Sequence, residues 1–427
     1  LFYISLIKYI LLGLISLSIV NGQGTMNSFG LGHYSFNQGI TSAGNGLNFL
    51  VPSFQRNVSL VNPSTWHNLQ YTYLSLSYSG DENTIDENTI NNGYSGLSNA
   101  IWIIPIKKKG SLGLSLSPYS DQRISLVSQD TLSFTAFDST FNYSNSFKRS
   151  GGIMAFKIGF SRLLNDKISI GFSGDFLFGS SRQNESIFFE GSSIIQTSRT
   201  NYSGVLGTFY LSSVFNEKFV LYASLKKSLK PLDGVYSKKY LFDDGNGNGY
   251  HDFSSPSDFP TPDSVSAYND IRLDGIHNPS AYSFGIESNI NKQSSLALEF
   301  KLLQDNGNVS DYLKFPANDW INESKYLNIS YTKTPNDLSL NFSDKIAFRS
   351  GISIKNHNLY ESKSTISEIG ASLGLGFKFK IVDNQIDLNY YVGKRSYSDT
   401  YKTEIVQQIQ VGVSLADIWF VKRRQKK

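Results

Sequence analysis

The sequence predicts an all-β protein: a transmembrane antiparallel β-barrel of about 14 strands with an N-terminal plug inside the lumen. Stretches in which apolar and small or polar residues alternate recur from residue 69 onward. Short polar turns alternate with much longer links, as in barrels whose short turns are periplasmic. Charged residues inside the alternating stretches fall on one face, which a wet lumen accommodates and a packed sandwich core does not.

Composition excludes several classes of protein. Of 427 residues, 17% are charged and 14% are aromatic, which argues against a disordered chain. The absence of cysteine excludes a disulfide scaffold and any thiolate chemistry. The formal net charge of +4 is too small for a nucleic-acid-binding protein, so no nucleic-acid partner is expected.

Residues 1–22 are predicted to be a secretory signal peptide. Lys8 precedes the apolar run 9–20, and the small residues Asn21 and Gly22 follow it. The alternatives are a short membrane anchor or a buried helix, but a spanning helix needs about 20 apolar residues. The mature chain is expected to begin near Gln23.

Residues 23–68 are predicted to form the plug. They are rich in glycine and aromatic residues and show neither a period of 2 nor one of 3.6. A segment of this kind has no face of its own to bury, so it must pack on or inside something larger.

Residues 69–420 are predicted to form the barrel, followed by a basic periplasmic tail at 421–427. In the stretch 167–180, Ile168, Ile170 and Phe172 share one face of a strand. Long extracellular loops are expected at 119–150, where a hairpin outside the membrane fits, and at 229–277. Other long links are expected at 80–97, 181–198 and 305–321. The predicted strands are 69–79, 98–106, 110–118, 151–163, 167–180, 199–214, 218–228, 278–290, 293–304, 322–334, 343–355, 364–380, 384–397 and 404–415.

A soluble β-sandwich is the alternative fold. Its strands would average about 5–6 residues, shorter than most of those predicted. The predicted inner face also carries charges that would destabilise a sandwich core. These residues are Lys157, Asp175, Lys226, Glu287, Glu299, Lys301, Arg349 and Asp387.

The order of these segments resembles the long-chain fatty-acid transporter family, which includes FadL and TodX. The resemblance rests on the glycine-rich segment 39–46 and on residues 57–64, in which Asn62 and Pro63 match the family's plug motif. Ser64 departs from the family's usual alanine, and Trp66 is an addition. The C-terminal residues 417–424 are similar to barrel ends of a Bacteroidetes-type branch.

The resemblance implies a barrel of about 14 strands, plugged by an N-terminal hatch, in the outer membrane of a Gram-negative bacterium. Family members take up hydrophobic compounds, which leave sideways through a wall opening made by a strand kink. The expected function is therefore passive uptake of hydrophobic small molecules such as long-chain fatty acids. The alternative, implied by the related branch, is a barrel that serves a secretion or surface partner, as in type IX secretion.

Aromatic residues of the plug are candidates for a ligand path, because sites for apolar molecules are concave and mostly apolar. The alternative is that they only pack the plug against the wall. The residues are Phe29, Tyr34, Phe36, Phe49 and Phe54.

The segment 243–252 is a candidate calcium loop, and calcium is the one cofactor considered. Asp244, Asn246, Asn248 and Asp252 supply oxygen donors, and Tyr250 offers its carbonyl, at the spacing of the front of an EF-hand loop. The bidentate Glu expected at the end of such a loop is replaced by Ser255. The alternative is a simple Asn/Gly turn.

No enzyme is expected. The five histidines show no metal-ligand spacing, and neither a nucleophile elbow nor a phosphate-binding glycine loop is present. The expected partners are outer-membrane lipid and hydrophobic small molecules, with a secretion or surface protein as the alternative.

Overall fold

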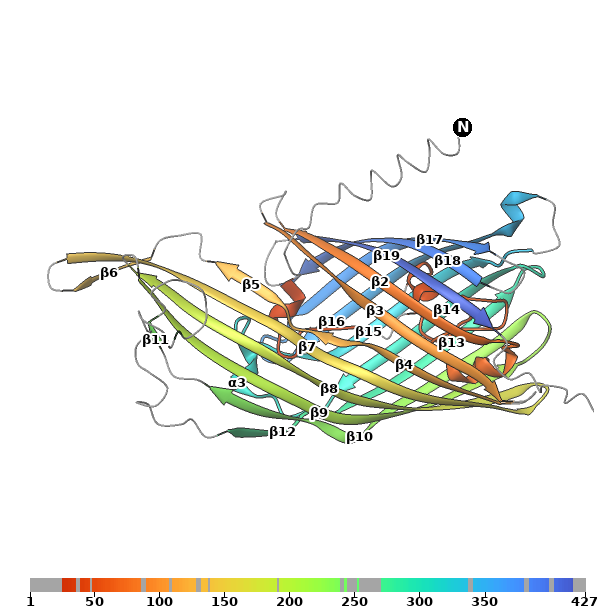
Figure 1. Cartoon of the computed structure of the whole chain (residues 1–427), viewed down its shortest axis with the longest axis horizontal. Coiled ribbons are helices and arrows are strands. Elements are labelled where there is room, and N and C mark those ends of the chain that lie inside the picture. Colours follow the sequence, from red (N-terminus) through yellow and green to blue (C-terminus); the bar gives the residue numbers. More distant parts are fainter. Residues whose placement is uncertain are drawn as a thin grey trace, which may run out of the picture.

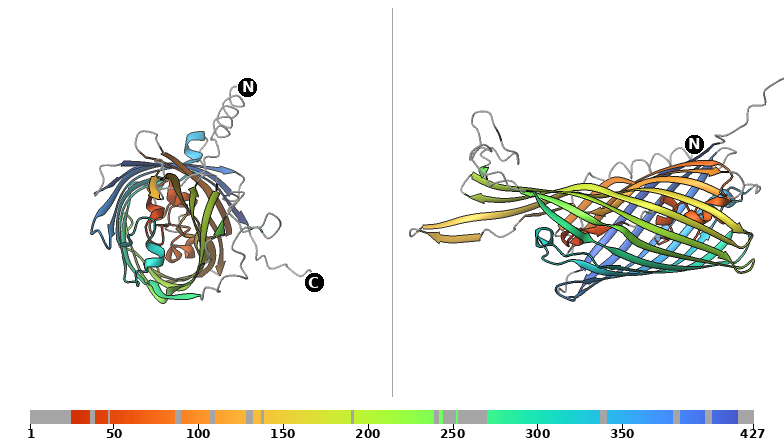
Figure 2. Two further views of the ribbon diagram at one scale, coloured as in Figure 1. Left: turned by 90° about the vertical axis from the view of Figure 1, so that its left-hand side faces the viewer. Right: turned by 90° about the horizontal axis from the view of Figure 1, so that it is seen from below.

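The computed structural model closes one antiparallel sheet into a barrel (Figures 1 and 2). Closure comes from the pairing of the last strand with the first barrel strand, from Asp417↔Thr72 to Glu404↔Ile85. The structure describes residues 25–35, 39–46, 48–85, 90–106, 110–127, 132–136, 139–189, 192–238, 242–243, 252, 270–336, 341–379, 384–398 and 403–417. The predicted signal peptide and basic tail lie outside these ranges.

All fourteen predicted barrel strands are confirmed, including the one that contains Pro105. They are β2 (Thr72–Ile85), β3 (Ile90–Ile106), β4 (Gly110–Asp121), β7 (Ser139–Asn165), β8 (Ile168–Phe189), β9 (Ser192–Val214), β10 (Phe219–Lys238), β13 (Pro279–Asn289), β14 (Ser294–Asp305), β15 (Ile321–Lys333), β16 (Ile346–Leu359), β17 (Thr365–Phe379), β18 (Asn384–Tyr397) and β19 (Thr403–Asp417).

The two faces of the wall follow the alternation in the sequence. Phe172 and Leu373 point outward with 50% and 56% of their surface exposed, whereas Ser173 is 7% exposed inside. The predicted inner-face charges are turned inward, among them buried Arg349 and Asp387. An apolar outer face around a polar interior is the arrangement of an outer-membrane barrel. Among the described residues, no helix is both long and apolar enough to cross a bilayer.

Several links that the sequence suggested were loops are strands. The predicted link 80–97 is mostly β2 and β3, and 181–198 is mostly the outer halves of β8 and β9. Strands β7 to β10 contain 27, 22, 23 and 20 residues, about twice the 9–11 that a tilted strand needs to cross the membrane. They therefore continue as a tall sheet beyond the barrel, seen in Figure 2.

The region 119–150 contains a hairpin, as predicted, and its position relative to the membrane stays a prediction. Strand β6 (Leu132–Ala136) pairs with the first residues of β7, and β5 (Ile124–Val127) pairs with β7 nearer the barrel. In the region 229–277, β10 continues to Lys238, and the described parts include β11 (Phe242–Asp243) and β12 (Ile271–His277). Short helices α3 (Asp311–Lys314) and η5 (Phe342–Lys345) lie in later connections.

The plug fills the lumen, as the view along the barrel in Figure 2 shows. Its elements are η1 (Thr25–Ser28), β1 (His33–Tyr34), α2 (Ile40–Ala43) and η2 (Pro63–Asn68). Wall glycines make room for η2. A Cβ on Gly113 would lie 2.4 Å from the Trp66 ring, and one on Gly171 would lie 2.6 Å from the backbone nitrogen of Ser64. The plug is thus seated against the wall backbone itself.

Candidate functional site: the plugged lumen and a break in the wall

Two inward charges of the wall hold the plug backbone. Glu299 accepts hydrogen bonds from the backbone N–H groups of Phe49 at 2.9 Å and Leu50 at 3.1 Å, and also from Val51. Arg349 donates to the carbonyl of Ser53 at 2.6 Å and forms a buried ion pair with Asp387, also at 2.6 Å. Backbone groups that would otherwise be unsatisfied in a closed lumen are therefore paired with wall charges.

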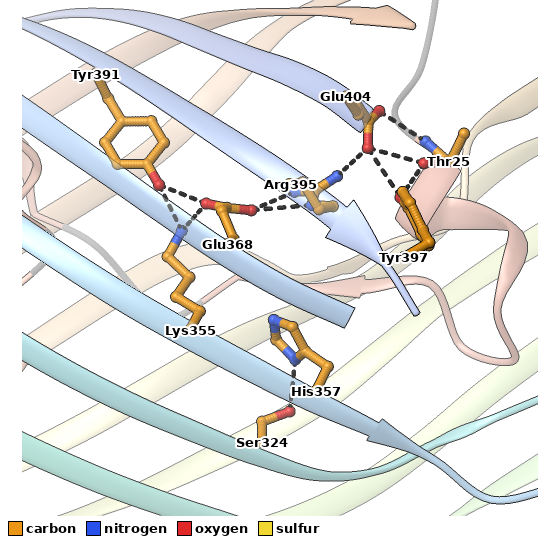
Figure 3. Close-up of polar contacts among 9 residues, drawn as sticks. All are labelled: Thr25, Ser324, Lys355, His357, Glu368, Tyr391, Arg395, Tyr397 and Glu404. Atoms are coloured by element: carbon orange, nitrogen blue, oxygen red, sulfur yellow. Dashed lines mark hydrogen bonds and ion pairs between the residues drawn. The ribbon is translucent and has the colours of Figure 1, made fainter. Parts of the chain in front are cut away.

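A row of alternating charges crosses four neighbouring strands (Figure 3). Lys355, Glu368, Arg395 and Glu404 stand opposite one another in the registers of β16 to β19. Lys355 Nζ lies 2.6 Å from Glu368, and Arg395 lies 2.7 Å from both Glu368 and Glu404. Cross-strand pairs of opposite charge stabilise a sheet, and burial strengthens their mutual attraction.

The end of this row holds the start of the plug. Glu404 accepts hydrogen bonds from the backbone N–H of Thr25 at 3.1 Å, from its hydroxyl at 2.8 Å and from the Tyr397 hydroxyl at 2.9 Å. Figure 3 shows Thr25 next to Glu404 and Tyr397 at the end of the row. The charge row is thus a latch for the N-terminal part of the plug.

The lumen retains small cavities between plug and wall. One of about 110 Å³ is lined by Tyr34, Phe49 and His33 of the plug and by Lys355 and Arg395 of the charge row. A second, of about 60 Å³, lies between the plug and a wider stretch of wall that includes β4, β7 to β10, β13 and β14.

The structure separates the predicted ligand-path aromatics into two groups. Tyr34 and Phe49 line both cavities. Phe29 packs against a buried apolar cluster that includes Met26 and Leu31 of the plug, and Phe54 is buried edge-on against Tyr73 of the wall. Phe36 lies outside the described residues. Contact of a ligand with any of these residues remains a prediction.

The predicted plug motif has a clear structural role. The Asn62 side chain caps η2 by accepting from the Ser64 N–H at 3.1 Å and donates to the Leu50 carbonyl at 2.9 Å. Pro63 takes the first helical position, where its missing N–H costs nothing. Trp66, the addition noted in the sequence, is buried and donates to the Ser59 carbonyl at 3.0 Å.

Most of the candidate calcium loop lies outside the described residues. Asp244, Asn246, Asn248 and Tyr250 belong to that part, and of the named ligands only Asp252 is described. No cluster of three or more metal-ligating side chains occurs in the ranges that the structure does describe. The calcium site stays a sequence-based prediction.

The wall is interrupted between β3 and β4. Their pairing ends at Ala100↔Leu116, although β3 extends outward to Ile90 and β4 to Asp121. In Figure 1, β3 continues beside β2, whereas β4 ends beside β7. We call the interval between β3 residues 90–99 and β4 residues 117–121 the β3–β4 break.

A bulge in each flanking strand explains the break. On β3, the register against β2 passes from Ser77↔Asn99 to Tyr78↔Leu97, so Ser98 is an extra residue. On β4, the register against β7 shifts between Pro118 and Ser120. Pro118 has no N–H to donate to a ladder, and bulges bend strands and increase their twist. The two strands therefore diverge from this level outward.

A mostly apolar pocket of about 500 Å³ lies among the extensions of the long strands. Leu126 and Val127 of β5, Ile187 of β8, and Phe315 from the connection after α3 contribute to its lining. Phe315 also packs edge-on against Phe147 of β7, with 4.8 Å between ring centroids. Most of the lining of this pocket therefore comes from strand segments that extend beyond the barrel.

Comparison with known proteins identifies the family. The BamG family model matches residues 4–426. The chain belongs to the BamG family. No curated protein matches this BamG-family chain significantly.

Solved structures share the fold of this BamG-family barrel at low sequence identity. A Pseudomonas aeruginosa FadL homologue is 12% identical, with 90% of this chain and 99% of that chain covered and a TM-score of 0.59. The CymD monoaromatic hydrocarbon channel is 13% identical, with the same coverage and a TM-score of 0.54. These likenesses confirm the FadL-like barrel. The Bacteroidetes-type branch remains a prediction.

Sequence analysis missed the charge row and the break. Lys355, Glu368, Arg395 and Glu404 each lie within a predicted strand, and alternation could have placed all four on the inner face. Alternation does not say which residues of neighbouring strands stand opposite. Pro118 was the one local signal for the break.

Proposed function

We propose that this outer-membrane barrel is a channel for hydrophobic small molecules, which leave the lumen sideways through the β3–β4 break. The break is the single observation that carries the proposal. An apolar solute that leaves through the wall enters the lipid directly. It avoids the polar part of the lumen where Glu299 and Arg349 bind the plug backbone and Asp387 pairs with Arg349. A straight aqueous route would have to displace those contacts.

The outer pocket and the inner cavity supply the rest of the route. The pocket of about 500 Å³ offers apolar walls to a molecule arriving from outside. Deeper in, Tyr34 and Phe49 face the small cavities, one of which reaches Pro118 and Tyr119 of β4 at the break. Fatty acids and aromatic hydrocarbons are the chemical classes proposed, and the structural neighbour CymD is described as a monoaromatic hydrocarbon channel.

Bridging the break tests the proposal. The chain has no cysteine, so Leu97→Cys with Pro118→Cys introduces the only two thiols, one on each side of the break. Bifunctional thiol reagents of increasing arm length are applied until the thiols join. Uptake of radiolabelled oleate and toluene into proteoliposomes is expected to fall strongly after bridging.

The matched control is Ala100→Cys with Leu116→Cys, which joins the last residues that are already paired. Bridging this pair should leave uptake unchanged. Full uptake through the protein bridged at positions 97 and 118 would eliminate the sideways route.

A second function, binding a protein partner, is favoured by a different observation. On β8 the outward apolar belt ends at Phe178, polar residues 179–186 follow, and then Ile187 and Phe188 are 44% and 42% exposed. Phe178 and Ile187 are nine residues apart, about 30 Å along the strand, so we expect Ile187 and Phe188 to lie beyond the bilayer. Because they are adjacent on a strand, both faces of the extension expose an apolar residue, as protein interfaces do.

Site-specific photo-crosslinking in intact cells tests this second function. A photoreactive residue at Phe188 should give a discrete adduct with one partner, and the same residue at exposed Arg182 should not. Identical patterns at the two positions would remove the support for a docking role.

A further inference from the structure

The plug strand β1 takes the place of β3 on the outer end of β4. His33 pairs with Asp121, Tyr34 pairs with Ser120, and the N–H of Ser35 donates to the Tyr119 carbonyl at 2.8 Å. Backbone groups without partners at membrane depth cost several kcal/mol each, so β4 can leave β3 only where another strand replaces it.

The close approach of β1 to β4 depends on Gly32. Its φ is +79°, and a Cβ there would lie 2.0 Å from the Asp121 carbonyl oxygen. Any side chain at this position would therefore push β1 away from β4. The pairing of β1 with β4 therefore requires a residue without a side chain at position 32.

A side-chain strut holds the same end of β4 inward. Tyr119, at the β4 bulge, places its hydroxyl 2.6 Å from Nε2 of His277, and Nδ1 of His277 lies 2.6 Å from Asp305. An imidazole that donates Nδ1–H to a carboxylate has Nε2 available to accept the Tyr119 proton. Asp305 is itself fixed by the N–H groups of Asn278 at 2.8 Å and Gly307 at 3.0 Å.

The plug joins this strut as well. The Tyr34 ring stacks on the His277 ring with 5.0 Å between centroids, and it meets the Tyr119 ring edge-on at 5.9 Å. His277 is fully buried at the end of β12, and Asp305 ends β14. One imidazole therefore ties the bent end of β4 and the plug strand to the opposite part of the wall.

We propose that the outer end of β4 has two alternative partners, and that Tyr119, His277 and β1 together select the arrangement in which the break is open. Tyr119 and His277 are positioning residues. When the plug strand β1 leaves, β4 pairs with β3 again and the break closes. The position of β1 and the opening of the wall therefore change together, between two states. This inference rests on the proposed sideways route, but it concerns strand position alone.

Disulfide trapping tests the inference without any transport measurement. All the proteins compared are the full chain carrying Leu97→Cys and Pro118→Cys, so the loss of the proline is common to them, and a difference in the rate of disulfide formation reports how often β4 approaches β3. Adding Tyr119→Phe removes the hydrogen bond to His277 while keeping the ring. Oxidation by copper phenanthroline, followed as a gel mobility shift, should become about five- to tenfold faster, the ratio expected for one lost hydrogen bond.

A second variant and two controls make the result unambiguous. Gly32→Ala, added to the same cysteine pair, should accelerate oxidation in the same way by displacing β1. Tyr222→Phe removes another buried tyrosine hydroxyl, bonded to Glu287 at 2.8 Å and not to His277, and should leave the rate unchanged. The cysteine pair at positions 100 and 116 should oxidise at one rate in every background.

Unchanged oxidation in both the Tyr119→Phe and the Gly32→Ala backgrounds, with heat-modifiable folded barrels on the gel, would overturn the inference. Loss of uptake on bridging together with unchanged oxidation would keep the sideways route and remove the two-partner mechanism. Faster oxidation without an effect of bridging on uptake would support the mechanism and remove the route.

Discussion

Thr25 donates two hydrogen bonds to Glu404, one from its backbone N–H at 3.1 Å and one from its hydroxyl at 2.8 Å, although 379 residues separate them. The contact fastens the first turn of the plug to the strand that closes the barrel. Arg395 also pairs with Glu404 at 2.7 Å. Loss of one member of the charge row would therefore weaken the contact that holds Thr25 of the plug.

Removing Arg395 should destabilise the protein strongly. Arg395→Met would leave the carboxylates of Glu368 and Glu404 buried without their shared cation, a change that costs about 3–5 kcal/mol. Lys325→Met is the matched control, because Lys325 is half exposed and its ion pair with Glu323 should contribute about 0–1 kcal/mol. Urea unfolding of the lipid-reconstituted barrel measures both, and similar losses would contradict the role of the charge row.

Releasing the plug backbone should make the barrel leak. Glu299→Ala removes the acceptor for the N–H groups of Phe49, Leu50 and Val51, so we expect a higher conductance for small ions in planar bilayers. Glu287→Ala removes another buried carboxylate, which bonds to Tyr222 of the wall, and should leave conductance low. Equal conductance in the two variants would show that Glu299 does not secure the plug.

The position of an added charge along β8 should decide how much it lowers the free energy of unfolding. Phe172→Arg places a guanidinium in the lipid belt and should cost about 2–4 kcal/mol near the midplane. Phe188→Arg changes an equally aromatic and similarly exposed residue beyond the polar stretch 179–186, and should cost about 0–1 kcal/mol. Reversible unfolding in lipid vesicles measures both. A large loss of stability from Phe188→Arg would place Ile187 and Phe188 inside the membrane.

Calcium should protect the 229–277 region if the sequence motif binds it. With two carboxylates, Asp244 and Asp252, and no bidentate Glu, the dissociation constant should be about 10⁻⁴–10⁻³ M. Limited proteolysis within this region should slow when calcium is added, and Asp244→Ala should remove the effect. Cleavage at one rate with calcium and with chelator would identify the motif as a turn.

The alternation of residues was sufficient to predict the barrel. Phe172 and Ser173 lie on opposite faces of β8 because successive side chains of any strand point in opposite directions, and this needs no knowledge of neighbouring strands. The plug was predictable for a related reason, since a segment without either period cannot form a wall strand. The outer halves of β8 and β9 were missed because the polar residues after Phe178 look like a loop.

Only the tertiary structure decided how the strands meet. Lys355, Glu368, Arg395 and Glu404 form a row because four registers align, and register depends on contacts between strands. The β3–β4 break likewise exists because β1, from the plug, pairs with β4 at the level where β3 departs. Alternation is a property of one strand at a time, whereas a latch and an opening need partners distant in the chain, whose pairing is set by the closed barrel.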